Sequence, residues 1–179
     1  EGMSSFFKKK LGHIKVNGLG MDNGDNDAKF REGQASKRAM TSGNGIAVTM
    51  DVDEPRNLHP ANKKPVGERL ALLALNKTYN QHVICVGPQY LSYEQNNAVI
   101  TLNFVDGTAT GLNTINNRPL NQYFYLAGTD HVFRLGNAVI NNDKIIVTAP
   151  AGTPLPVQAV RYAFTNFPVT NLQNAANLP

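Results

Sequence analysis

The sequence predicts a mixed fold, α/β in its first part and all-β in its second, and two observations lead to that division. Up to about residue 81, segments rich in helix formers alternate with one short β-branched run, a pattern typical of α/β units. From residue 82 onward, short alternating strands follow one another between turn residues, as in antiparallel β-sandwiches. We therefore expect an α/β domain over residues 1–81 and an antiparallel, jelly-roll-like β-sandwich module over residues 82–179.

Two helices are expected in the first part. Helix formers dominate residues 28–40. The second helix is predicted over residues 65–78, because Pro65 is tolerated in a first turn and apolar side chains then recur at helical spacing. The apolar face of this helix is expected to pack on a core.

A buried strand is expected between the two helices. Residues 45–50 read Gly-Ile-Ala-Val-Thr-Met, a β-branched apolar run typical of a strand covered on both faces of a parallel sheet. In open α/β sheets the functional site lies beyond the carboxyl ends of such strands. The chemistry is therefore expected in residues 51–60, which we call the acidic segment.

The second part carries strand patterns separated by turn residues. Asn96 and Asn97, Asp106 and Gly107, and residues 141–143 have the chemistry that tight turns require. The predicted strands are Tyr90–Tyr93, Ala98–Phe104, Gln122–Leu126, His131–Leu135, Lys144–Thr148 and Val157–Phe164.

Composition excludes several classes of function. The chain has 179 residues and a formal net charge of +4, but its basic residues do not form a stripe, and Lys8–Lys10 is the only triple run. Nucleic-acid binding is therefore not expected. No stretch approaches the 18 apolar residues of a membrane span, and residues 1–10 lack the apolar core of a signal peptide. Because the chain starts at Glu1, we expect a processed or fragmentary polypeptide.

Two other patterns favour structure over chemistry. The single cysteine, Cys85, lies in the apolar run 83–86 and is expected to pack as a small hydrophobic side chain. The acidic cluster of residues 22–27 superficially resembles a calcium loop but lacks the spaced terminal Glu of an EF-hand, so a surface turn is favoured.

The acidic segment combines one imidazole with several carboxylates. Its sequence, Asp-Val-Asp-Glu-Pro-Arg-Asn-Leu-His-Pro, includes Asp51, Asp53, Glu54 and His59. A general base that activates a serine needs an imidazole whose second nitrogen is oriented by a carboxylate or carbonyl. From spacing alone, a structural histidine remains the commoner interpretation.

Several separated motifs between residues 28 and 179 resemble a known family. They are an Arg-Glu-Gly-Gln stretch at 31–34, the apolar run at 46–51, the His-Pro pair at 59–60, a Val-Gly-Glu-Arg-Leu-Ala stretch at 66–71, and a tail with Asn171, Leu172, Asn174 and Leu178. In this order they resemble the C-terminal portion of the sialate O-acetylesterases, carbohydrate esterases of the SGNH hydrolase superfamily. The resemblance implies that residues 1–81 are the C-terminal part of an SGNH α/β/α sandwich.

The resemblance also implies roles for two residues. His59 would be the catalytic base and Asp53 its acid partner, with Asp51 as the second candidate and Asn57 able to orient the imidazole through its amide oxygen. Serine-type acyl transfer needs neither a metal nor an organic cofactor. The substrate would be an O-acetylated sugar, and the family resemblance places the protein in the periplasm or outside the cell.

The nucleophile of that family is missing from this sequence. Its Gly-Gln-Ser-Asn block is nowhere in the 179 residues, and Ser42 has the surroundings of a turn residue. Base, nucleophile and oxyanion hole act as a unit. We therefore expect an N-terminal esterase segment, or a second chain, to supply the serine; no membrane or nucleic-acid partner is expected.

Two alternatives remain open. The chain could be a non-catalytic carbohydrate-binding or structural module derived from such an esterase, with tyrosines that stack on sugar rings, although alternating aromatics in strands are more often core residues or cross-strand pairs. The candidate tyrosines are Tyr90, Tyr93, Tyr123, Tyr125 and Tyr162. A zinc site is much less favoured, because the four histidines, His13, His59, His82 and His131, lack close ligand spacing.

Overall fold

The computed structural model describes residues 26–40, 44–52, 54 and 61–179, and the chain divides into two compact units. Unit 1 comprises residues up to Val86 together with Phe164–Val169, and unit 2 comprises Gly87–Ala163 and Thr170–Pro179. The segment 164–169 therefore belongs to unit 1, although the residues before and after it belong to unit 2. Most of the acidic cluster at residues 22–27 lies outside the described residues.

Unit 1 contains both predicted helices. They are α2, Asn26–Met40, and α3, Lys64–Lys77, each within two residues of its predicted bounds. Pro65 lies in the first turn of α3, where its missing N–H group costs nothing. The sequence prediction of these two elements is confirmed.

The segment 164–169 closes the start of α2. The side-chain oxygen of Asn166 accepts a hydrogen bond from the Asp27 backbone N–H at 2.9 Å, and the Arg31 guanidinium donates to the Thr165 carbonyl at 2.8 Å. The first N–H groups of a helix have no partner within the helix. Asn166 therefore supplies from a distance the acceptor that a local capping residue would otherwise provide.

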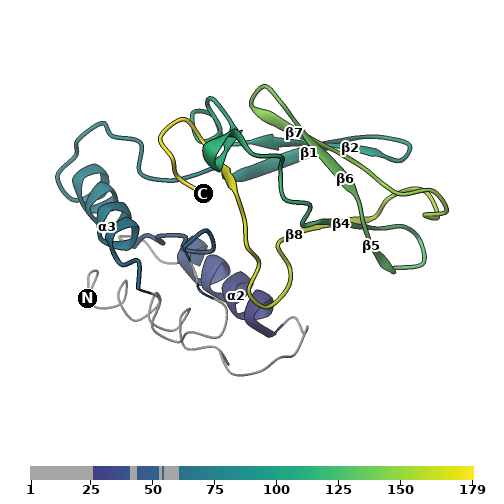
Figure 1. The fold of residues 1–179 in the computed structure, drawn as a ribbon, viewed down its shortest axis with the longest axis horizontal. Helices are drawn as coiled ribbons and strands as arrows, with labels where there is room; N and C mark the ends of the chain where they lie inside the picture. Colours follow the sequence, from purple (N-terminus) through teal and green to yellow (C-terminus); the bar gives the residue numbers. More distant parts are fainter. Residues whose placement is uncertain (1–25, 41–43, 53, 55–60) are drawn as a thin grey trace. The chain divides into compact units, whose positions relative to one another are not determined.

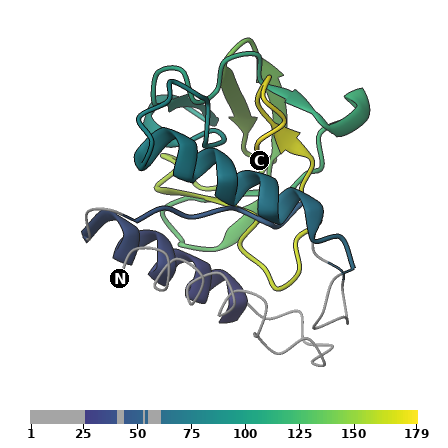
Figure 2. The ribbon, with the colours of Figure 1, turned by 90° about the vertical axis from the view of Figure 1, so that its left-hand side faces the viewer.

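The predicted strand at residues 45–50 is wrong. The segment 44–49 forms no strand, and every strand pair that the described residues form is antiparallel, so the expected parallel sheet is absent from this part of the chain. A β-branched run becomes a strand only when a neighbour pairs with its backbone. Figure 2 shows the segment running instead beside α3.

Unit 2 consists of antiparallel sheets in two layers (Figure 1). One sheet has the strand order β1-β2-β7-β6 and the other β5-β4-β8, while β3 and β9 form a separate two-stranded pair. The strands are β1 Tyr90–Asn96, β2 Val99–Phe104, β3 Asn113–Thr114, β4 Phe124–Ala127, β5 Phe133–Leu135, β6 Asn137–Asn141, β7 Lys144–Thr148, β8 Ala159–Tyr162 and β9 Leu172–Gln173. A short 3₁₀ helix, Ile115–Asn117, follows β3.

The two layers share one apolar core. Ile145 and Val147 of β7 are fully buried against Leu126 of β4. Phe124 stacks on Tyr162 with ring centroids 4.4 Å apart. The mixed helical and β organisation predicted from the sequence is thereby confirmed, with β6 as a strand that the prediction missed.

Two of the predicted turns lie in the hairpin connections of unit 2. Asn97 and Asn142 take positive φ angles, 51° and 52°, in the two-residue connections of the β1–β2 and β6–β7 hairpins. Asparagine tolerates this left-handed region better than most residues with a side chain. The register of both hairpins is fixed in this way.

Candidate functional site

Arg69 is a buried, hydrogen-bonded charged residue of unit 1. It lies on the core-facing side of α3, and its side chain and that of Asp51 are 8% and 7% exposed. The Nη1 nitrogen donates to an oxygen of Asp51 at 2.8 Å and to the Val48 carbonyl at 2.7 Å, and Nη2 donates to the other Asp51 oxygen at 2.5 Å. This two-bonded geometry matches the planar fork of a guanidinium to a carboxylate.

The consequence is that the start of the acidic segment is fixed to α3. Asp51 is its first residue, and the Val52 N–H closes a turn onto the Thr49 carbonyl at 3.2 Å. Moving two charges from water into the protein interior costs free energy, and hydrogen bonds to both charges offset that cost. Here both carboxylate oxygens accept a hydrogen bond from Arg69, which also donates to a backbone carbonyl, so Asp51 is an anchor of this segment in the structure.

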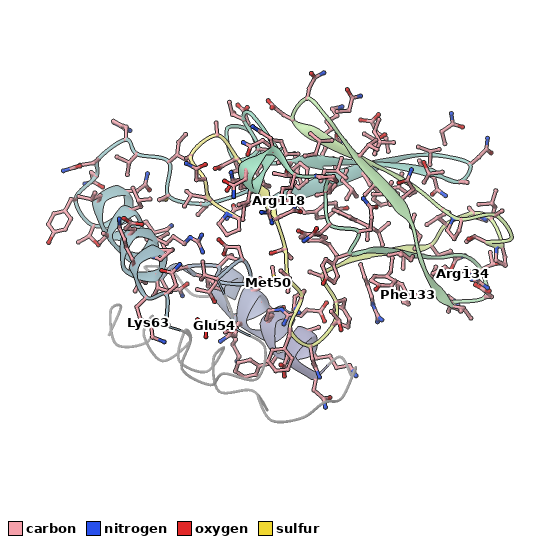
Figure 3. The ribbon with its side chains drawn as sticks, in the orientation of Figure 1. Met50, Glu54, Lys63, Arg118, Phe133 and Arg134 are labelled. Carbon is pink, nitrogen blue, oxygen red and sulfur yellow. The ribbon has the colours of Figure 1, made fainter. Side chains whose placement is uncertain are left out.

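The far end of the segment is held by a second contact. An Oε1 oxygen of Glu54 accepts a hydrogen bond from the Ala61 backbone N–H at 2.9 Å. Lys63 N–H then bonds to the Ala61 carbonyl at 3.0 Å, and α3 begins at Lys64. Figure 3 labels Glu54 and Lys63, the latter immediately before the start of α3.

The two predicted catalytic residues, His59 and Asp53, lie outside the described residues, as does Asn57. The described residues closest to them in sequence are Val52, Glu54 and Ala61. The roles of His59 and Asp53 stay predictions, and the contacts on either side show only how the segment that carries them is attached.

The described serines do not provide a nucleophile beside a base. The Ser36 hydroxyl donates to the Glu32 carbonyl within α2 at 3.0 Å, and Ser92 on β1 accepts from Asn103 at 3.4 Å. Ser42 lies outside the described residues. Within the described ranges, no group of three His, Cys, Asp or Glu side chains could hold a metal ion, and no helix is long and apolar enough to cross a membrane.

The role of Arg69 could have been found in the sequence. It stands three residues after Val66 and four before Leu73, on the stripe of α3 that the apolar residues define. A charged residue on an apolar stripe is rarely fully buried without a partner. The sequence therefore signals a buried ion pair, but Asp51 as its partner follows only from the packing.

The tyrosines of β1 are exposed and form cross-strand pairs. Tyr90 and Tyr93 are each 58% exposed, so of the two settings expected for alternating strand aromatics, the core or a cross-strand pair, they take the second. The register places Tyr90 opposite Phe104 and Tyr93 opposite Leu102, with an irregularity between Tyr90 and Ser92. Because directly paired residues share a side of a sheet, both rings lie on the same side of this edge strand.

The other three candidate tyrosines are more enclosed. Tyr162 stacks on Phe124 next to the core of unit 2, and Tyr123 and Tyr125 are half-buried. On β8, the Arg161 guanidinium lies 3.9 Å from the centre of the Phe133 ring of β5, a cation–π contact. Cys85 is half-buried.

Comparison with known proteins finds a likeness among solved structures. No protein-family model matches the sequence, and no curated protein matches it. Among solved structures, the chain is similar to the crystal structure of a carbohydrate acetylesterase from Xanthomonas citri, with a TM-score of 0.78 and 30% sequence identity. The match covers 90% of this chain and 37% of the other, so the chain spans little more than a third of the length of the protein it resembles.

Proposed function

We propose that this chain is part of a carbohydrate esterase that removes O-acetyl groups from sialic acid or a related acetylated sugar. The observation that carries the proposal is the likeness to a carbohydrate acetylesterase over 90% of the chain. The ordered motifs at residues 31–34, 46–51, 59–60 and 66–71 support the same class independently. The finer assignments, to the sialate O-acetylesterases and to an SGNH sandwich over residues 1–81, belong to the proposal.

In the proposed reaction His59 is the general base. A seryl hydroxyl attacks the acetyl carbonyl and passes its proton to His59, and the imidazolium then protonates the departing sugar oxygen. Water, deprotonated by the same imidazole, hydrolyses the acetyl-serine and releases acetate. Asp53 orients the imidazole and stabilises its charged form; Asp51 is less suited, because both of its oxygens already bind Arg69.

The serine and the oxyanion hole come from outside these 179 residues in this proposal. An N-terminal esterase segment or a second chain would supply them, and the enzyme would act in the periplasm or outside the cell. The likeness supports this division, since the matching part is 37% of the acetylesterase.

Acetate release from acetylated oligosaccharides tests the proposal. The chain is assayed alone and joined to any sequence that its gene encodes ahead of Glu1, with His82→Ala as the control for a histidine elsewhere in unit 1. We expect release by the joined form and not by the 179 residues alone. His59→Ala should lower that release by at least about 10³-fold, as loss of a catalytic base does, and His82→Ala should leave it unchanged. Equal release by the His59→Ala variant and the wild type would refute the assignment of the base.

A second function, carbohydrate binding without hydrolysis, is favoured by the exposure of Tyr90 and Tyr93. Two aromatic faces on one side of a strand can stack on the apolar faces of sugar rings. Calorimetric titration with the same oligosaccharides separates the two functions. Saturable binding that Tyr93→Ala weakens, without any acetate release, would favour the binding module over the esterase.

A further inference from the structure

We infer that β1 carries a binding site for an uncharged, extended oligosaccharide, the neutral part of an acetylated glycan. The site consists of Tyr90, Tyr93 and Gln95 on one side of the strand, with the half-buried Phe104 of β2 opposite Tyr90. The inference rests on carbohydrate binding, the second function proposed above, and adds where the ligand lies and which chemistry it has. It holds whether or not the chain also takes part in hydrolysis.

The first step of the argument is that β1 is an edge strand which the facing layer leaves uncovered. β1 pairs with β2 alone in a four-stranded sheet, and the other layer has three strands. Tyr93 is opposite Leu102, a residue of the apolar core, so the tyrosines lie on the side of the sheet that faces the other layer. All seven residues of β1 are nevertheless exposed. Two aromatic rings are therefore left on a surface that the fold itself does not use.

The second step is the spacing of the side chains. The β2 partners of Tyr90 and Tyr93 are two residues apart, which places the tyrosines about 7 Å apart along the strand. Gln95 is opposite Ile100 and follows Tyr93 on the same side. Aromatic faces stack on the apolar C–H faces of sugar rings, and a side-chain amide both donates to and accepts from hydroxyl groups. A ligand that covers both rings and reaches the amide must contain several sugar units.

The third step is the charge of the site. The single charged residue of β1 is Glu94, which is opposite Thr101 and therefore on the other side of the strand from Tyr93. On that side the Glu94 carboxylate accepts a hydrogen bond from Asn103 at 3.0 Å and pairs with Lys144 at 3.6 Å. β1 thus presents no counter-charge beside its tyrosines for the carboxylate of a sialic acid. An uncharged chain of sugars fits this side of the strand better.

The fourth step separates a sugar chain from a protein strand as the ligand. The pairing of β1 with β2 is irregular between Tyr90 and Ser92. Such an irregularity bends the strand and disturbs the row of backbone groups that an added strand would need. Recognition through two rings and an amide does not depend on that row. The edge of β1 therefore favours a ligand bound by side chains.

Calorimetric titration of the 179-residue chain with three uncharged chains, cellohexaose, xylohexaose and mannohexaose, tests the inference. We expect saturable binding of at least one of them, which Tyr90→Ala and Tyr93→Ala each weaken at least about tenfold, because each removes a stacking face. Tyr93→Phe keeps the ring and should stay within about threefold of the wild type. Tyr79→Ala is the matched control: Tyr79 is a 68% exposed tyrosine of unit 1, and its loss should leave the affinity unchanged.

Unchanged affinity in both alanine variants of β1 would overturn this site and leave carbohydrate binding elsewhere on the chain. Binding of a sialic acid tetramer in preference to all three neutral chains would overturn the uncharged ligand. If no sugar binds, the site and the binding function both fail, while the acetate assay still decides the esterase proposal separately. A dimer in sedimentation that Tyr93→Ala converts to a monomer, without sugar binding, would assign the surface to a second copy of the chain instead.

Discussion

Arg69 and Asp51 are 18 residues apart in sequence, and their side chains meet through two hydrogen bonds of 2.8 and 2.5 Å in the interior of unit 1. Each group is the counter-charge that makes burial of the other tolerable. The pair therefore links the helix α3 to the segment that precedes the predicted catalytic histidine, and the cost of breaking it can be measured.

Asp51→Ala should lower the free energy of unfolding by about 3–5 kcal/mol, because it leaves the Arg69 charge buried without its partner. The double variant Asp51→Ala, Arg69→Met should be less destabilised than Asp51→Ala alone. Urea denaturation followed by circular dichroism measures both. Glu68→Ala is the control: its ion pair with Lys64 is exposed, and a loss as large as that of Asp51→Ala there would contradict the burial argument.

Two glycine-to-alanine substitutions should change stability in opposite directions. A Cβ atom on Gly128 would lie 1.7 Å from the Pro154 carbonyl oxygen, whereas one on Gly67 in α3 would meet nothing within 4 Å. Gly128→Ala should therefore cost about 1–3 kcal/mol, as overpacking does, and Gly67→Ala should stabilise α3 by about 1 kcal/mol. Thermal unfolding measures both changes, and a stabilised Gly128→Ala variant would show that the two loops can separate freely.

Asn174 should be sensitive to loss of its amide. Its side chain is 1% exposed, donates to the Thr108 carbonyl at 2.9 Å, and accepts from the Ala176 and Leu178 N–H groups at 3.0 and 3.1 Å. Asn174→Ala leaves these groups buried without that partner, at about 1–3 kcal/mol for each unsatisfied group. Asn174→Asp keeps the oxygen that accepts from Ala176 and Leu178 and replaces the nitrogen that donates to Thr108 by a carboxylate oxygen. Hydrogen exchange at the Ala176 and Leu178 amides should therefore be slower in the Asn174→Asp variant than in Asn174→Ala.

Glu94 gives a prediction about pH. The side-chain hydrogen bond from Asn103, followed by the charge of Lys144, lowers the pKa of the Glu94 carboxyl from its ordinary value. Since the folded-state pKa is the lower one, these contacts stabilise the fold above the ordinary glutamate pKa of about 4.3 and stop doing so as the pH falls through the folded-state value.

Asn103→Ala and Lys144→Met should each raise the pKa of Glu94, because the first removes the hydrogen bond of the amide and the second removes the charge and the hydrogen bond of the lysine. Carbon-13 titration of the Glu94 carboxyl measures the change. An unchanged pKa of Glu94 in Asn103→Ala would contradict the role of the hydrogen bond as the largest cause.

The strand pattern of unit 2 was largely predictable; the prediction missed β3, β6 and β9, and the longest of these, β6, is instructive. Residues 137–141 alternate in burial, with Ala138 buried and Val139 48% exposed, but polar asparagines at both ends hide the short apolar centre. The signal that could have revealed β6 is the turn at Asn142, which joins it to β7 as a hairpin. A strand so short gains its stability from its neighbour, so its sequence alone carries little periodicity.

The aromatic residues show where periodicity is insufficient. Tyr93 and Tyr162 both lie in strands, yet Tyr162 packs on Phe124 and Tyr93 is exposed on an edge strand. Local spacing decides on which side of a strand a ring lies. Only the other layer of the sandwich decides whether that side is covered.

The sequence by itself determined the local elements: α3 from Pro65 and its apolar spacing, the hairpins from their asparagine turns, and the succession of short strands from alternation. Tertiary structure alone decided that residues 45–50 form no strand and that Arg69 pairs with Asp51. The physical reason is the range of the interactions involved. Turn and helix preferences act within a few residues, whereas a strand and a buried charge both depend on a partner that only the folded chain brings within reach.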